Sequence, residues 1–324
     1  MHYFQRHISE PNPCQGSLAL CWLWAGGLDC QRAHRTACVI FHRWPPLVVF
    51  FRNMQFSSLV SLFATLAVSA VSAQVPWSYD GFTGPAYWST LSPSYAACAV
   101  PKAQPAAGQP LPPQQSPINI QSQILPKRTV NYPKYYLGNL TNVPVTWRQS
   151  SITLNLTQLD HVCVEWNGVR YGIQDIFLHT PSEHRIDSKY GDLAIHIVGK
   201  SPQNHLLITS VIMQDSPDEH LTLSEASRAF ISPIVASLPS MANQTATIPS
   251  INLQSTVDLL NQTGYFTYNG SITAPPCSPA TWVIMANMQT VCTTERIKLL
   301  NRLGVNARPV QPWIVPAPAT GYHT

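Results

Sequence analysis

Short segments of alternating apolar and polar residues recur from residue 116 onward, and they constrain the fold more than any other feature. Each is rich in β-branched or aromatic residues and is bounded by turn residues, as is typical of strands. Two intervening stretches, 218–238 and 255–263, are compatible with short helices. We therefore predict one mainly β domain over 74–315, followed by a tail at 316–324. The expected strands cover 116–121, 151–157, 161–166, 169–179, 193–199, 205–213 and 280–286.

The composition agrees with a folded domain and argues against one class of partner. Of the 324 residues 45% are hydrophobic and 10% are charged, which supplies one sizeable core and is too little charge for a disordered chain. The chain has 19 Lys and Arg against 15 Asp and Glu, and its basic residues form no stripe. We therefore expect no nucleic-acid partner.

Residues 54–73, MQFSSLVSLFATLAVSAVSA, have the pattern of a secretory signal peptide. An apolar run follows Met54, and small residues close it. A transmembrane anchor is the alternative, but the run is rich in Ser and near the lower length limit for spanning. Residues 1–53 show no clear period, and we interpret them as a spurious or disordered leader that precedes the true start at Met54.

Cysteines and glycosylation sequons also point to export. Four cysteines follow the signal segment, an even number that suits an oxidising compartment. Five Asn-x-Ser/Thr sequons are glycosylation candidates. Together these features predict a secreted, extracellular glycoprotein. The sequon asparagines are Asn139, Asn155, Asn243, Asn261 and Asn269.

Five segments resemble, in order, elements of the α-type carbonic anhydrase family. The resemblance covers nearly all of 77–312. It implies a single domain built on a large, mostly antiparallel sheet with a few short helices and a zinc site at the bottom of a cone. It also implies the reversible hydration of carbon dioxide to bicarbonate. The segments are WSYDGFTGPAYW (77–88), QSPINI (115–120), HTPSEHRID (179–187), YNGSITAPPCSPATW (268–282) and NARPVQP (306–312).

The family's zinc needs three neutral imidazoles and a fourth position for water, whose pKa the metal lowers to about 7. The resemblance places two of these ligands at His179 and His196. The remaining position falls on Phe177, on the same strand face as His179, and a phenyl ring has no lone pair to donate. Asp175 shares that face, but it lies about 6.6 Å further along the strand, so we do not expect it to replace the ligand.

The groups that would orient the ligands also depart from the family. The resemblance implies Gln at 175 and Glu at 194, where the chain has Asp175 and Ala194. Losing such partners typically costs about 10–100-fold in metal affinity or activity. The family's proton-shuttle histidine has no counterpart, since no His occurs between Lys127 and His161.

Other parts of the family's site are present. Glu183 and Thr273 match the pair in which the Glu accepts from the Thr hydroxyl that orients the zinc-bound hydroxide, and His184 matches the family's structural histidine. Val198 and Trp282 match walls of the carbon dioxide pocket. The alternative is that this buried polar network persists because it holds the fold together.

Extracellular relatives imply a disulfide between Cys98 and Cys277. Cys163 and Cys292 lie in strand-like segments and match no bridge of the family, so we expect both to be buried thiols.

Two functions remain open. The first is a secreted carbonic-anhydrase-like protein that lacks normal hydratase activity and acts as a binding or structural module, with a glycan, protein or small-molecule ligand. The second is an active zinc hydratase that uses an unidentified third ligand and takes carbon dioxide and bicarbonate as substrates. Phe177 favours the first, in which zinc is weakly held or absent. His179 and His196 would then be packed core imidazoles or a weak two-histidine metal site.

Overall fold

The computed structural model describes residues 75–100, 114–148, 150–216 and 225–313. The predicted leader, signal segment and tail lie outside these residues. None of the helices in the described part of the chain is long and apolar enough to cross a membrane. The helical segments are η1 (Gly81–Thr83), α1 (Trp88–Leu91), η2 (Pro93–Cys98), α2 (Glu225–Ala236), α3 (Gln254–Asp258), α4 (Leu260–Thr263) and α5 (Thr293–Leu303).

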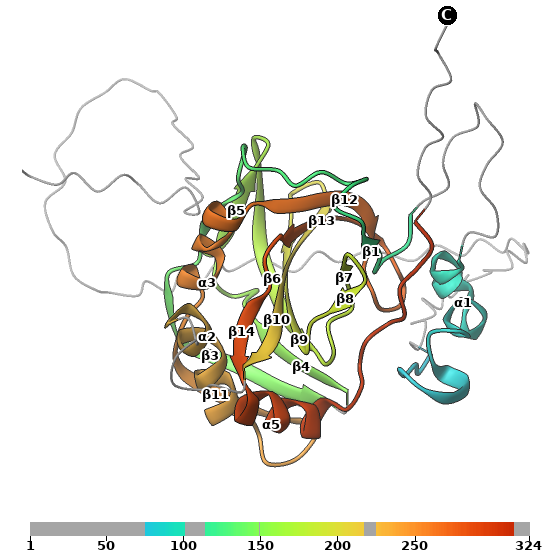
Figure 1. The fold of residues 1–324 in the computed structure, drawn as a ribbon. Helices are drawn as coiled ribbons and strands as arrows, with labels where there is room; N and C mark the ends of the chain where they lie inside the picture. The colour runs from blue at the N-terminus through green and yellow to red at the C-terminus, as the bar shows by residue number, and fades with distance from the viewer. Residues whose placement is uncertain (1–74, 101–113, 149, 217–224, 314–324) are drawn as a thin grey trace, which may run out of the picture. The chain divides into compact units, whose positions relative to one another are not determined.

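A large, mostly antiparallel sheet dominates the described residues, as predicted (Figure 1). Its main path runs β11-β3-β4-β6-β9-β10-β13-β12, with β14 beside β10, β5 beside β6 and β2 beside β5. Only β10 makes parallel pairs in this sheet, with β13 and β14. A smaller sheet has the order β1-β7-β8. The strands are β1 (Asn119–Ile120), β2 (Lys134–Tyr136), β3 (Asn139–Arg148), β4 (Ser151–Asn155), β5 (Cys163–Trp166), β6 (Val169–His179), β7 (Arg185–Ile186), β8 (Lys189–Tyr190), β9 (Leu193–Lys200), β10 (Leu206–Ser216), β11 (Gln244–Asn252), β12 (Tyr265–Ser271), β13 (Pro279–Met285) and β14 (Gln289–Cys292).

The period-two segments form strands where the sequence predicts them, and the two helical expectations are met by α2 and by the pair α3 and α4. Strands β2, β3, β7, β8, β11, β12 and β14 were not predicted. The two longest of these, β3 and β11, contain proline and many exposed residues. The positions of β3 and β11 in the sheet explain why these strands tolerate proline. Strand β11 is at the end of the main path, and Pro144 of β3 precedes the residues that pair with β4, so neither proline removes a central ladder bond.

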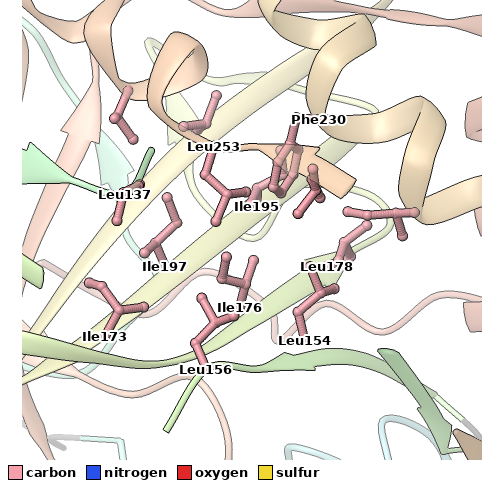
Figure 2. Packing of buried hydrophobic residues seen from close by; sticks show 14 of the residues in the cluster. Leu137, Leu154, Leu156, Ile173, Ile176, Leu178, Ile195, Ile197, Phe230 and Leu253 are labelled. Carbon is pink, nitrogen blue, oxygen red and sulfur yellow. The ribbon is translucent and has the colours of Figure 1, made fainter. Parts of the chain in front are cut away.

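Alternation along β6 and β9 separates the hydrophobic core from the polar site. Ile176 and Leu178 of β6 are buried in the same cluster as Ile195 and Ile197 of β9 (Figure 2). Phe230 of α2 packs on this face, and buried residues of α3 and α5 complete the cluster. The intervening side chains must point to the opposite face. That face carries Phe177, His179 and His196.

A disulfide joins the N-terminal arm to the loop between β12 and β13. Cys98 and Cys277 are bonded, with their Cα atoms 5.1 Å apart, and both are buried beside Trp88 and Tyr95. Cys163 is buried and disulfide-bonded, so the expectation of a thiol there is wrong. Cys292 is a free thiol, but it is half-buried rather than buried.

Removing the Cys98–Cys277 bridge should lower the free energy of unfolding by about 2–5 kcal/mol, because the bridge closes a loop spanning 179 residues. The measurement is urea unfolding, followed by tryptophan fluorescence, of the Cys98→Ser/Cys277→Ser variant. Cys292→Ser is the matched control and should change the unfolding free energy by less than about 0.5 kcal/mol. Equal midpoints for the double variant and the wild type would contradict the expectation.

Candidate functional site

Two neighbouring antiparallel strands bring the predicted metal-binding histidines together. In the β6–β9 register Phe177 lies opposite His196, and His179 lies opposite Ala194. His179 and His196 are therefore diagonal neighbours on one face, and their ring centroids are 4.6 Å apart. Both side chains are buried.

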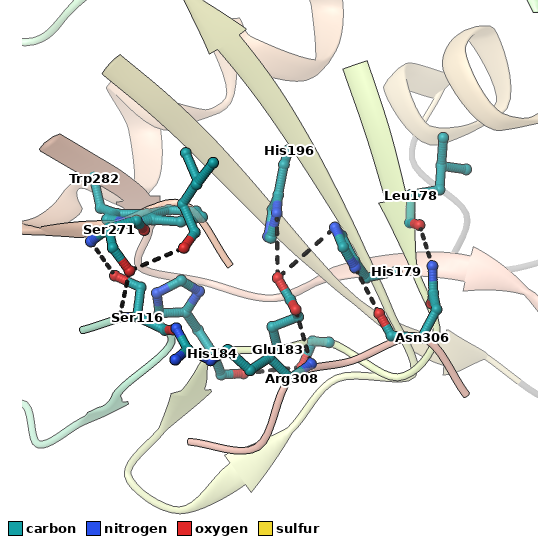
Figure 3. Close-up of polar contacts among 12 residues, drawn as sticks. Ser116, Leu178, His179, Glu183, His184, His196, Ser271, Trp282, Asn306 and Arg308 are labelled. Carbon is teal, nitrogen blue, oxygen red and sulfur yellow. Dashed lines mark hydrogen bonds and ion pairs between the residues drawn. The ribbon is translucent and has the colours of Figure 1, made fainter. Parts of the chain in front are cut away.

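Glu183 reaches the two histidines from the turn that follows β6. Ser182 holds this turn: its backbone N–H donates to Gly191 O, and its hydroxyl oxygen accepts from the Gly191 N–H. A side chain at 191 would meet Ile212 at 2.3 Å, so this close approach requires glycine. The turn directs Glu183 Oε2 to 3.7 Å from His179 Nε2 and 3.6 Å from His196 Nδ1 (Figure 3).

The other side of the Glu183 carboxylate is hydrogen-bonded. Oε1 accepts from the Arg308 backbone N–H at 2.9 Å, and the Thr273 side chain also bonds the carboxylate. The structure thus brings the predicted Glu183–Thr273 pair together. Burial raises the pKa of Glu183, and the nearby His179, these hydrogen bonds and the charge of Arg308 oppose that rise. Oε2 has no hydrogen-bond partner among the described residues, since 3.6–3.7 Å exceeds hydrogen-bond range.

The His179 ring is fixed from behind by Asn306. His179 Nδ1 lies 2.9 Å from Asn306 O, and because a carbonyl can only accept, Nδ1 carries the proton. The lone pair is then on Nε2, which faces Glu183. The Asn306 side chain accepts from the Thr180 N–H and donates to Leu178 O and Ser150 O. Sequence analysis missed Asn306 as a site residue, although the NARPVQP match contains it.

Only one ring nitrogen of His196 faces a polar group among the described residues. Nδ1 faces Glu183, while the buried Nε2 has no hydrogen-bond partner in the part of the chain that the structure describes. This agrees with the expected loss of a partner at Ala194. Burial lowers the pKa of His196 well below its usual value, and the nearby His179 and His184 lower it further. His196 is therefore neutral at neutral pH.

Phe177 and Asp175 occupy the remaining positions on this face of β6. Phe177 is half-buried directly across from His196. Asp175 Oδ1 accepts from the Asn155 amide at 3.0 Å. Burial raises the pKa of Asp175. Among the described residues, only His179, Glu183 and His196 form a group with metal-ligand donors within 4.8 Å of one another, and Asp175 is not part of it.

His184 belongs to a separate buried network. Its Nε2–H donates to the Tyr268 hydroxyl, which donates in turn to Ser116 Oγ. Burial lowers the pKa of His184 to about 3, with His179 adding to the effect, so the ring stays neutral. Trp282 packs 4.5 Å from this ring and 4.9 Å from that of His196, measured between centroids. Val198 is half-buried and packs in the same apolar cluster as Trp282.

Known proteins share this architecture. The profile described as eukaryotic-type carbonic anhydrase matches residues 102–312. A carbonic anhydrase of Nostoc sp. is 26% identical, over 79% of this chain and 90% of the relative. The solved fungal α-carbonic anhydrase of Aspergillus oryzae has a TM-score of 0.64 at 22% identity, covering 74% of this chain and 94% of its own. Dioscorin solved in complex with ascorbate has a TM-score of 0.58 at 21% identity, covering 73% and 94%. At these identities the two solved structures show the fold alone.

Replacing Asn306 with Ala should lower the free energy of unfolding by about 2–4 kcal/mol. The change leaves the buried Thr180 N–H and the Leu178 carbonyl unpaired, and each unsatisfied group costs about 1–3 kcal/mol. Chemical denaturation measures the effect. Asn301→Ala, at an exposed position in α5, is the control and should change stability by less than about 0.5 kcal/mol. A neutral Asn306→Ala would show that these bonds do not support the site.

Proposed function

The chain belongs to the eukaryotic-type carbonic anhydrase family, and from this premise we propose that it is a secreted member without normal hydratase activity that serves as a binding or structural module. One observation carries the proposal: Phe177 occupies the strand position that faces His196 and shares a face with His179. The chemistry of the family depends on three neutral imidazoles at this place.

The three-imidazole zinc set does not fit these residues. A phenyl ring contributes no donor atom, and Asp175, the other residue considered as a replacement, is bonded to Asn155 instead. The His196 Nε2 also lacks the hydrogen bond that would orient the ring and raise its basicity. Zinc bound through imidazoles alone, as in the family, would therefore be weakly held or absent.

The residues that remain suit a small-molecule ligand. Val198 is half-buried and packs with the buried Trp282, and Thr273 and Glu183 form a hydrogen-bonded pair. A few polar groups among apolar side chains are typical of ligand sites. Dioscorin, which has this fold, was solved with ascorbate. We propose a small polar molecule as the ligand, with a glycan or protein on the outer surface as the alternative.

A second candidate is an active zinc hydratase that uses another third ligand, with carbon dioxide and bicarbonate as substrates. The position of Glu183 favours it, because one carboxylate oxygen faces both histidines. The absence of a family-like proton shuttle between Lys127 and His161 counts against efficient turnover even then.

Secretion is supported by the surface as well as by the signal-like segment. All five sequon asparagines are exposed on the described part of the chain, so each is open to glycosylation. Protein expressed through a secretory pathway should lose mass on treatment with an N-glycosidase. An unchanged intact mass would count against the glycoprotein proposal.

Wild-type protein loaded with zinc should hydrate carbon dioxide far more slowly than Phe177→His. The substitution supplies the missing imidazole across from His196. Adding Asp175→Gln and Ala194→Glu should tighten zinc by about 10–100-fold more, because it restores hydrogen-bond partners of the ligands. Stopped-flow hydration and zinc stoichiometry measure both effects, with Phe177→Leu as the matched control that adds no donor. High wild-type activity that Phe177→His leaves unchanged would overturn the proposed loss of activity.

A further inference from the structure

The geometry points to a divalent-metal site formed by His179, His196 and Glu183, in which a carboxylate oxygen replaces the missing imidazole. The donor set differs from the three imidazoles of the family. The inference rests on the proposed function in one respect, since it takes the imidazole set to be broken at Phe177. It adds to the proposed small-molecule ligand a metal ion held at the buried site.

Distances fit a shared ion. Glu183 Oε2 lies 3.7 Å from His179 Nε2 and 3.6 Å from His196 Nδ1, and all three donors lie within 4.8 Å of one another. Zinc binds imidazole nitrogen and carboxylate oxygen at about 2.0–2.2 Å, so tetrahedral ligands stand about 3.3–3.5 Å apart. The two contacts to Glu183 need to shorten by a few tenths of an ångström, and the two histidine nitrogens, which lie within 4.8 Å of each other, must also come to this spacing.

The orientation of the two imidazoles also favours a cation at the centre. His179 donates from Nδ1 to Asn306 O and so turns the Nε2 lone pair towards Glu183. His196 directs Nδ1 to the same carboxylate oxygen. Two imidazole nitrogens and a carboxylate oxygen thus converge on one buried point. Such a group is costly when unpaired and is stabilised by a bound cation.

Burial strengthens the argument. Glu183 is 1% exposed and His196 is 3% exposed, and Glu183 Oε2 has no hydrogen-bond partner among the described residues. Buried polar atoms without partners are rare in native proteins and often mark an ion site. The other Glu183 oxygen is occupied by the Arg308 N–H, so the carboxylate is held with Oε2 towards the histidines.

A shared proton is the competing explanation. An imidazolium at position 179 or 196 would donate to Glu183, but such a bond should be about 2.7–2.9 Å long. The observed 3.6–3.7 Å suits an interposed ion better. Two imidazoles and one carboxylate favour first-row divalent transition metals such as Zn²⁺ and Co²⁺ over Mg²⁺ or Ca²⁺, which prefer oxygen donors. Two histidines and a glutamate already bind zinc in unrelated enzymes.

A carboxylate ligand has a consequence for activity. It cancels one unit of the ion's charge, which three neutral imidazoles do not, and therefore weakens the polarisation of a fourth ligand. The site can thus bind metal and still hydrate carbon dioxide poorly. Metal binding and hydratase activity are separate properties of this chain and can be tested separately.

The test uses the full secreted chain, stripped with a chelator and titrated with Co²⁺ and Zn²⁺. We expect one equivalent to bind, with the visible absorption of four- or five-coordinate Co²⁺. Glu183→Gln keeps the shape but loses the anionic donor, and it should weaken binding by more than the about 10–100-fold that loss of an outer hydrogen-bond partner costs. His161→Ala changes an exposed histidine outside the site and should bind as the wild type does.

A rescue variant separates loss of the ligand from misfolding. Phe177→His/Glu183→Gln should regain Co²⁺ binding, because the new imidazole supplies the third donor on the correct strand face. A wild type that takes up no metal would overturn the proposal and favour the shared proton. Equal affinity of wild type and Glu183→Gln would overturn it in favour of a two-histidine site. Neither result bears on hydratase activity, which the carbon dioxide assay measures independently.

Discussion

The Glu183 carboxylate is the group around which the site is organised. A carboxylate that is 1% exposed is tolerated only with strong partners, and the chain supplies them from distant segments. Thr273 comes from the loop after β12, and the backbone N–H of Arg308 comes from the C-terminal segment. The two histidines come from adjacent strands. The buried carboxylate is therefore stabilised by segments from across the domain and not only by the turn that carries it.

Arg308 links several of these distant segments through hydrogen bonds. Its guanidinium donates to Cys98 O, Ser116 O and Gln115 Oε1, so the C-terminal segment contacts the disulfide-linked arm and the segment leading into β1. Burial lowers the pKa of Arg308 to about 10, and attraction to Glu183 opposes the decrease. The side chain thus stays charged at neutral pH. The same residue supports the fold through its side chain and the site through its backbone.

The sequence led to the fold and to the two histidines through the resemblance of five segments to the carbonic anhydrase family, and the strand pattern agrees with it. Period-two alternation predicts β6 and β9, and it is consistent with His179 and His196 on the face opposite the core residues Ile176 and Ile197. Strand β11 was not predicted, because an edge strand tolerates Pro249 and exposed residues that hide the strand pattern. The approach of Glu183 to both histidines was not predictable from spacing, because it depends on the Gly191 contact and on residues more than 120 positions away.

The two oxygens of Glu183 explain how the site could change while the fold persisted. Oε1 is engaged by Arg308 and Thr273 contributes to the same carboxylate, and these contacts hold the carboxylate whether or not an ion is present. Oε2 is the free atom, and it faces the two imidazoles that remain. With Phe in place of an imidazole at position 177, Glu183 Oε2 is therefore already held in position as the third donor. A ligand that binds the folded chain alone adds to its stability in proportion to the logarithm of ligand concentration. Selection for a stable secreted domain could thus retain metal binding at this carboxylate after selection for hydration had ended.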